Sequence, residues 1–192
     1  MKFKKIYIEI INYCNLNCKF CLKTKKQNRM MTLNEFNKII NDIKKYTDYI
    51  YLHLQGEPLL HPSLKEILEI CYQNNINVNI TTNATLLSSN IDILLESKAL
   101  RQVNISLQAL QSLPNKEKYY DDIISLINKN KNIYIQLRFW GNLKNNDIIK
   151  ELNYFENKLN TKINLEETNK ILPRTFISLD EEFTWPSING VE

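Results

Sequence analysis

The chain has 192 residues, of which 43% are hydrophobic and 24% are charged, so it is long and apolar enough for one folded domain. Its formal charge of +4 arises from lysines and arginines spread along the sequence, which gives no indication of a nucleic-acid partner. No apolar run reaches the roughly 18 residues of a membrane span, and the apolar segment after the basic start contains Glu9 and Asn12. We therefore expect a cytoplasmic protein that binds neither nucleic acid nor membranes.

Segments with alternating apolar and polar residues follow one another along the chain, separated by segments of helical period. A capping box at Thr32 and Glu35 opens the first predicted helix. Later helices are expected near residues 64–71, 89–98, 119–130 and 148–159. The predicted strands cover residues 4–11, 49–55, 76–82, 103–108 and 133–140, and a weaker sixth strand covers 162–166.

This alternation predicts an α/β fold, an open partial (β/α)6 barrel of parallel strands with helices outside, since a closed eightfold barrel needs about 250 residues. We place the barrel at residues 1–168 and an irregular C-terminal tail, which can include short extended pieces, at 169–192. Five strands keep one face apolar and put polar residues on the other. Helices would cover the apolar face, and the polar face would line an open lumen for a polar ligand. The alternative is a sheet with one face simply in water.

Three of the four cysteines, Cys14, Cys18 and Cys21, lie close together directly after the first predicted strand. Thiolates at this spacing can hold three irons of a cubane cluster and leave the fourth iron open to another ligand. A disulfide framework is not expected, because the distant Cys71 gives no sensible pairing and nothing marks the chain as secreted. A structural zinc site is the alternative, although the two histidines are far along the chain.

The CxxxCxxC spacing, with Phe20 before the last cysteine, resembles the signature of the radical S-adenosylmethionine (SAM) enzymes. Residues 56–58 (GEP) look like the GGEP element of that family, with Gln55 in place of its first glycine. Residues 81–87 (TTNATLL) are similar to its TNGTLL element, and residues 104–108 (NISLQ) resemble its ISLDG strand. The order of these elements along the chain makes the resemblance specific.

The resemblance implies two cofactors, a 4Fe-4S cluster on the three cysteines and SAM bound through its amino and carboxylate groups to the open iron. In the GEP turn, Gly56 permits close backbone approach and Pro58 removes an amide donor, so bare carbonyls can face the SAM ammonium group. By resemblance, Asn83 and Ser106 are SAM candidates and Phe20 flanks the adenine. The predicted metal ligands are Cys14, Cys18 and Cys21, and the predicted cofactor-binding residues are Phe20, Gln55, Gly56, Glu57, Pro58, Asn83, Ser106 and Arg138.

Two residues of the polar face are candidates for catalytic roles. Arg138 is expected on the lumen side of the fifth strand, where its guanidinium can pair with the SAM carboxylate. The alternative is a structural ion pair with Glu9 or Glu166. His53 also faces the predicted lumen as a proton donor or substrate contact, and its alternative is a hydrogen-bonded structural histidine.

The activity that the resemblance implies is reductive cleavage of SAM to methionine and a 5′-deoxyadenosyl radical that abstracts hydrogen from a substrate. The electron would come from a cytosolic donor of the flavodoxin or ferredoxin type. Residues 182–187 (EFTWPS) resemble a segment that leads into the cysteine-rich extension of peptide- and protein-modifying members, so a peptide or protein substrate is expected. Two alternatives stay open: a partner module that keeps the fold without catalysis, and a zinc-stabilised structural domain.

Overall fold

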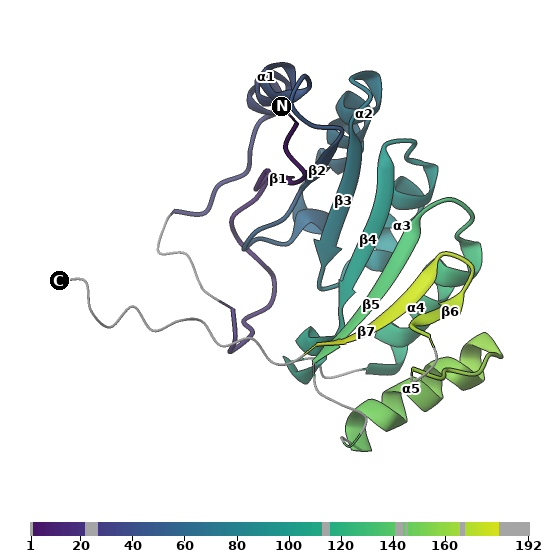
Figure 1. Ribbon diagram of the computed structural model, residues 1–192. Coiled ribbons are helices and arrows are strands. Elements are labelled where there is room, and N and C mark those ends of the chain that lie inside the picture. Colours follow the sequence, from purple (N-terminus) through teal and green to yellow (C-terminus); the bar gives the residue numbers. More distant parts are fainter. Residues whose placement is uncertain are drawn as a thin grey trace, which may run out of the picture.

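A sheet with the strand order β1-β2-β3-β4-β5-β7-β6 is the framework of the chain in the computed structural model (Figure 1). The structure describes residues 2–21, 27–112, 116–140, 144, 146–165 and 168–180. All neighbouring strands pair in parallel except β6 with β7, which are antiparallel. The strands are β1 (Ile6–Tyr7), β2 (Tyr49–Tyr51), β3 (Asn77–Thr82), β4 (Leu100–Ser106), β5 (Tyr134–Trp140), β6 (Lys170–Leu172) and β7 (Thr175–Asp180).

Helices connect the parallel strands and cover one face of the sheet. This is the face turned away from the viewer in Figure 1. The α-helices are α1 (Leu33–Ile43), α2 (Leu64–Gln73), α3 (Leu87–Glu96), α4 (Lys116–Lys129) and α5 (Asn146–Leu159), with short 3-10 turns η1 (Pro58–Leu60) and η2 (Leu107–Ser112). The predicted capping box is confirmed, since the Thr32 side chain accepts from the Glu35 amide while the Glu35 carboxylate accepts from the Thr32 amide.

The core lies between the sheet and these helices because every second strand residue is apolar and points toward them. Ile50, Val78, Val103 and Ile135 represent four neighbouring strands and are all fully buried. From the helices, residues such as Phe36, Ile67, Leu94, Ile123 and Phe155 fill the same core. Burial of this apolar area at about 25 cal/mol per Å² is the main force that holds the layers together.

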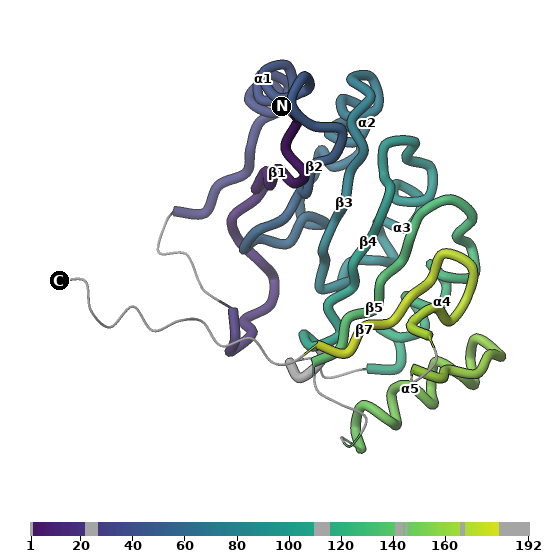
Figure 2. Tube along the Cα trace, in the orientation of Figure 1, coloured from purple at the N-terminus to yellow at the C-terminus, as the bar shows by residue number. Residues whose placement is uncertain are grey.

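The opposite face of the sheet is polar and half-buried, and among the described residues no helix covers it over β3, β4 and β5 (Figure 2). Thr81, Gln102, Asn104, Gln136 and Ser178 alternate there with the buried residues of their strands. The sheet does not close, because β1 and β6 form its two edges. The predicted open partial barrel of parallel strands, with its helices on the outside, is therefore confirmed.

The end of the sheet differs from the prediction. Residues 162–165 form no strand, and the sixth parallel strand is β7, which pairs with β5. Residues 170–180 were expected in the tail, as irregular or short extended pieces, but they form the β6–β7 hairpin and belong to the sheet, while residues 181–192 lie outside the described residues. The reason is tertiary: β7 alternates only weakly in sequence, but its Thr175 and Ile177 are buried against the core.

None of the described helices combines the length and apolar character needed to cross a bilayer.

Candidate cofactor site

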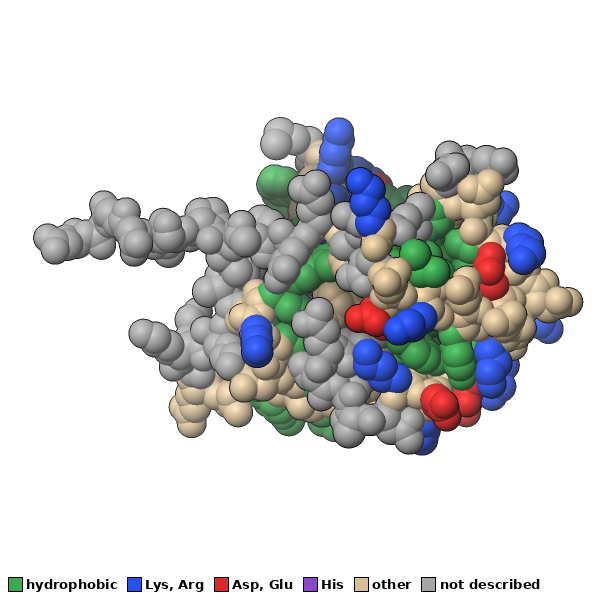
Figure 3. All heavy atoms as spheres, turned by 90° about the horizontal axis from the view of Figure 1, so that it is seen from below, with side chains coloured by type: hydrophobic (Ala, Val, Ile, Leu, Met, Phe, Trp, Pro, Cys, Tyr) green, Lys and Arg blue, Asp and Glu red, His purple; other side chains and the backbone are tan. Residues whose placement is uncertain are grey.

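Three loops that the sequence singles out meet at the carboxyl ends of the strands, the end of the sheet seen in Figure 3. Glu57 joins them. Its amide donates to the carbonyl of Tyr13 in the cysteine loop at 3.0 Å, and its carboxylate accepts from the Thr82 hydroxyl at 2.6 Å and the Asn83 amide at 2.7 Å. It also accepts from the Leu59 amide at 3.0 Å, which caps η1. The cysteine loop (residues 13–21), the GEP turn (residues 56–58) and the TNA turn (residues 82–84) thus form one hydrogen-bonded unit.

The buried position of Glu57 defines what this carboxylate does. The residue is 2% exposed, and burial raises its pKa, while the hydrogen bonds from Thr82, Asn83 and Leu59 act in the opposite direction. Both carboxylate oxygens already accept hydrogen bonds from the protein. Glu57 therefore holds the loops in place, and its carboxylate does not face a ligand.

Asn83 connects the TNA turn to the cysteine loop through its side chain. Its Nδ2 lies 3.3 Å from the Cys14 sulfur and donates to the Asn15 side-chain oxygen at 2.9 Å. Its Oδ1 accepts from the amide and the hydroxyl of Thr85, and Asn15 in turn donates to that hydroxyl at 2.8 Å. Sequence reasoning missed Asn15 and Thr85. In the sequence, the only indication of their role is that each is a polar residue within one of the two motifs.

The TNA turn has the backbone geometry that favours glycine. Ala84 adopts a φ of 62° in the left-handed region, so the glycine that is usual in the resembling element would fit this position without strain. Tyr119 of α4 fixes the turn from the core side, since its hydroxyl donates to the Asn83 carbonyl at 2.9 Å. Tyr119 and the neighbouring Tyr120 are both buried.

Gly56 is required by the backbone of the cysteine loop. A Cβ atom added at this position would lie 1.9 Å from the Ile11 carbonyl oxygen and 2.6 Å from its carbon, distances that no side chain can occupy. The close approach that the sequence suggested toward a ligand is thus an approach to the chain leaving β1. Gly56 sets the spacing between the GEP turn and the cysteine loop.

The carbonyls of the GEP turn divide into two groups. Those of Glu57 and Pro58 accept from the amides of Leu60 and His61, so η1 uses them. The carbonyls of Gln55 and Gly56 have no hydrogen-bond partner among the described residues. The replacement of glycine by Gln55 is accommodated, because its amide donates to the Glu9 carboxylate at 2.8 Å. Two bare carbonyls therefore remain that can receive an ammonium group.

None of the three predicted metal ligands forms a disulfide, and Cys14 and Cys21 are exposed while Cys18 is partly exposed. Among the described residues, no group of three Cys, His, Asp or Glu side chains is arranged as a metal site. The donor set nevertheless fits a cluster, because thiolates are the ligands that iron–sulfur clusters use and no disulfide competes for them. Metal binding commonly completes the folding of its own loop.

Phe20 and Ser106 lie toward the other end of this edge. The Phe20 ring packs against Trp140 at the end of β5, with ring centroids 4.3 Å apart. Ser106 ends β4 and pairs in register with Arg138 of β5, whereas the predicted strand continuation to Gln108 is instead the turn η2. The cysteine loop therefore extends from the end of β3, at Asn83, to the end of β5.

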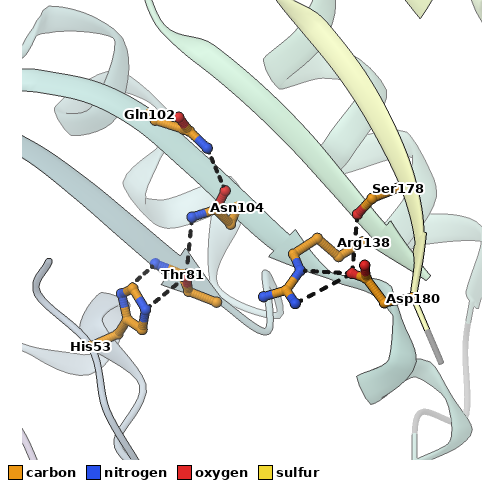
Figure 4. A network of polar contacts seen from close by, with 7 residues as sticks. All are labelled: His53, Thr81, Gln102, Asn104, Arg138, Ser178 and Asp180. Carbon is orange, nitrogen blue, oxygen red and sulfur yellow. Dashed lines mark hydrogen bonds and ion pairs between the residues drawn. The ribbon is translucent and has the colours of Figure 1, made fainter. Parts of the chain in front are cut away.

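Arg138 forms an ion pair that the sequence analysis did not predict (Figure 4). Its Nε and Nη2 both lie within 3.4 Å of the Asp180 carboxylate, which also accepts from Ser178. Asp180 was missed because it lies in the segment expected to be irregular. The alternative ion pair with Glu9 does not form, and the Glu9 carboxylate instead accepts from the Gln55 amide. The other alternative partner, Glu166, lies outside the described residues. Among the described residues, the Nη1 of Arg138 has no acceptor.

His53 is bound on both ring nitrogens by the same neighbour, Thr81 (Figure 4). The Thr81 amide donates to Nδ1 at 3.2 Å, so Nε2 carries the proton and donates to the Thr81 hydroxyl at 3.1 Å. Burial, with a smaller effect of the Arg138 charge, lowers the pKa of His53 to about 4. A neutral, fully hydrogen-bonded imidazole matches the structural alternative rather than a proton donor at neutral pH.

The remaining thiol and histidine bear on the zinc alternative. Cys71 is fully buried in α2, and burial raises its pKa to about 12, so it is a thiol of the core. His61 contacts the Met31 carbonyl through Nε2 and accepts from the Ser63 amide through Nδ1. Since both histidines of the chain use both ring nitrogens, neither offers a free nitrogen to a zinc ion held by the cysteine loop.

Residues 8–152 match the model of the Radical SAM superfamily, which is well over half of the chain. The chain therefore belongs to the radical SAM superfamily. The members of this superfamily use a 4Fe-4S cluster and SAM, and the match covers both the three cysteines and the GEP and TNA turns.

The chain matches curated relatives over only part of their length. The chain is 30% identical over 118 residues to a tungsten-containing aldehyde ferredoxin oxidoreductase cofactor-modifying protein of Pyrococcus furiosus, and 34% identical over 118 residues to a GTP 3′,8-cyclase of Chlorobaculum tepidum. Each match covers 59% of this chain, but 32% and 34% of the relatives. The chain thus spans about a third of the length of these proteins.

Solved structures share the fold. Streptococcus suis SuiB bound to S-adenosylmethionine superposes with a TM-score of 0.64 and 20% identity, over 98% of this chain and 43% of SuiB. BtrN in complex with AdoMet and 2-DOIA gives a TM-score of 0.57 and 19% identity, over 71% of this chain and 58% of BtrN. At these identities the likeness is one of architecture.

Proposed function

We propose that this chain is the core of a radical SAM enzyme in which Cys14, Cys18 and Cys21 hold a 4Fe-4S cluster. The observation that carries the proposal is the hydrogen-bonded unit formed by the cysteine loop, the GEP turn and the TNA turn around Glu57. All three elements lie within the matched region, and they meet at the carboxyl ends of parallel strands, where α/β folds bind their ligands.

The surrounding residues suggest how SAM is held. The bare carbonyls of Gln55 and Gly56 can accept from its ammonium group, and Nη1 of Arg138 is available for its carboxylate. Asn83 and Ser106 offer polar contacts at the same edge, while Phe20 offers a ring face for adenine. In this arrangement Glu57 and Pro58 act through the shape of the turn rather than through their side-chain atoms.

When bound, the cluster and SAM supply the reductive chemistry that generates a 5′-deoxyadenosyl radical. The chain's own contribution is to orient SAM and to keep water from the reacting atoms. A reductant of the flavodoxin or ferredoxin type in the cytoplasm would supply the electron.

A peptide or protein is the substrate class we favour. The support is the fold shared with SuiB, which has also been solved bound to the precursor peptide SuiA, and a partly open polar sheet face that an extended chain can follow. The rival function is a partner module that keeps the fold without catalysis. Its support is the sequence of the two turns, where Gln55 and Ala84 stand in place of glycines of the resembling elements.

The test is anaerobic reconstitution with iron and sulfide, followed by a reduced assay for 5′-deoxyadenosine. We expect about four irons per chain, a brown charge-transfer absorbance and SAM-dependent nucleoside formation. Cys14→Ala, Cys18→Ala and Cys21→Ala should each abolish both signals. Cys71→Ala is the matched control, because it removes a thiol that is buried in α2 and should leave cluster assembly intact.

The outcomes separate the candidates. A cluster without nucleoside product would favour the non-catalytic module, and zinc bound in place of iron would overturn both cluster readings. Equal loss of iron in the Cys71→Ala control would show that the variants fail by misfolding, which circular dichroism of the same samples would reveal.

A further inference from the structure

Two arginines at the amino-terminal end of the open sheet face enclose an aromatic ring. The guanidinium carbon of Arg101 lies 5.5 Å from the centroid of the Tyr134 ring, and that of Arg174 lies 5.1 Å from the same centroid. Arg101 also lies 5.4 Å from the Tyr49 ring. These four residues, Tyr49, Arg101, Tyr134 and Arg174, form what we call the arginine–tyrosine cluster, at the end of the sheet opposite to the cysteine loop.

The fold holds both arginines in place by unusual backbone features. At a register irregularity between β3 and β4, two consecutive residues of β4, Arg101 and Gln102, lie opposite the single residue Asn79 of β3. Arg174 adopts a φ of 62° in the β6–β7 turn, and its carbonyl accepts from the Ile135 amide at 2.8 Å. A non-glycine residue in this region is strained, so the turn fixes Arg174 at some cost.

No carboxylate of the described residues neutralises the positive charges of this cluster. Within the described part of the chain, neither Arg101 nor Arg174 forms an ion pair with a carboxylate. Arg101 donates only through Nη1, to the side-chain oxygens of Asn79 and Gln102, and no described residue accepts from its Nε or Nη2. The cluster therefore presents unused donors and uncompensated positive charge beside aromatic rings.

A pocket of about 170 Å³ lies at this position, lined by Arg101, Gln102, Tyr134, Ile135, Gln136 and Phe176. Gln102 also belongs to the polar track of the open face, because its side chain donates to Asn104, which donates to Thr81 beside His53 (Figure 4). The pocket is thus continuous with the face that leads toward the cofactor site.

We propose that the arginine–tyrosine cluster binds a carboxylate side chain of an acidic peptide substrate that lies extended along the open face. This inference rests on the proposed function and deepens it by naming the substrate's charge. From Arg101 to Ser106 the strand advances about 16 Å at roughly 3.3 Å per residue. An extended peptide would therefore carry its acidic residue about five positions from the residue that reaches the cofactor site.

The test measures binding of fluorescein-labelled hexaglutamate by anisotropy, with labelled hexaglutamine as the uncharged probe, on the full chain without added iron. Hexaglutamate should bind at least about tenfold more tightly than hexaglutamine at low salt, and the double variant Arg101→Gln, Arg174→Gln should lose most of that difference. Lys38→Gln, Lys129→Gln is the matched control, since it removes the same charge from exposed positions on α1 and α4 that form no ion pair with any described residue. It should change the affinity less than twofold.

Equal weakening in both double variants would overturn the proposal, because it would reduce the effect to net charge. GTP is the competing anion, given the GTP 3′,8-cyclase relatives. Arginine-dependent binding of GTP without binding of hexaglutamate would also overturn it. Since binding is measured without iron, cluster assembly and peptide binding succeed or fail separately. Circular dichroism of the arginine variant shows whether a loss of binding is a loss of fold.

Discussion

His53 shows how a residue with catalytic chemistry can be committed to structure. Both its nitrogens are bound by Thr81, and that threonine also accepts from Asn104, so the imidazole extends a polar network across β3 and β4. A charged imidazolium would lose the hydrogen bond that Nδ1 accepts from the Thr81 amide, and it would face the positive charge of Arg138. The neutral form is therefore part of the fold.

This state predicts a loss of stability in mild acid. Because the pKa of His53 is lowered to about 4 in the folded chain and is near 6.5 in the unfolded chain, its contribution is complete above pH 6.5 and is lost as the pH falls toward 4. After allowance for its partial exposure, the contribution is on the order of 2 kcal/mol. Denaturant unfolding of wild type and His53→Gln at several pH values measures this contribution. Between pH 4 and 6.5, the free energy of unfolding of the variant should depend less on pH than that of wild type. Equal slopes would contradict the assignment.

At the scale of elements, the cofactor site is a contact between turns rather than a set of side chains on one element. Gly56 of the GEP turn touches the backbone at Ile11, and Glu57 binds both the cysteine loop and the TNA turn. The sequence indicated that these turns share one edge, because parallel strands end together there. It could not indicate that Glu57 faces inward, since a carboxylate is rarely buried unless its partners come from other segments.

Gly56→Ala tests the contact between these two elements. The added Cβ would meet the Ile11 carbonyl, so either the turn or the cysteine loop must move. We expect a loss of at least about 2 kcal/mol in the free energy of unfolding, together with weaker cluster assembly. Gln55→Ala is the control, because it keeps the backbone amide that binds Glu9 and should cost less than about 1 kcal/mol. A Gly56→Ala protein as stable as wild type would show that the approach is not required.

At the scale of the whole molecule, the sheet is completed by the β6–β7 hairpin. β7 pairs with β5 over six residues, places Ile177 in the core and brings Asp180 to Arg138 on the open face. The same hairpin positions Arg174 beside Tyr134. Residues 170–180 are thus part of the barrel, and both ends of its open face depend on them.

Ile177→Ala should therefore destabilise the chain as strongly as a change in a central strand. Ile177 is fully buried, and removing its side chain leaves a cavity that costs about 2–4 kcal/mol. Lys170→Ala, at an exposed position of β6 in the same hairpin, should change the free energy of unfolding by less than about 0.5 kcal/mol. Thermal and denaturant unfolding compare the two. Similar small effects in both variants would mean that the hairpin is only loosely attached.

The sequence by itself determined the strand–helix order, the open parallel sheet with one polar face, and the cysteine spacing that indicates the superfamily. These features are local, because side-chain period and motif spacing are written along a single stretch of chain. Only the tertiary structure decided the partners: Asp180 for Arg138, Thr81 for His53, Asn83 for Cys14 and Ile11 for Gly56. Such pairs join residues far apart in the chain, and their identity depends on register and burial, which no single segment encodes.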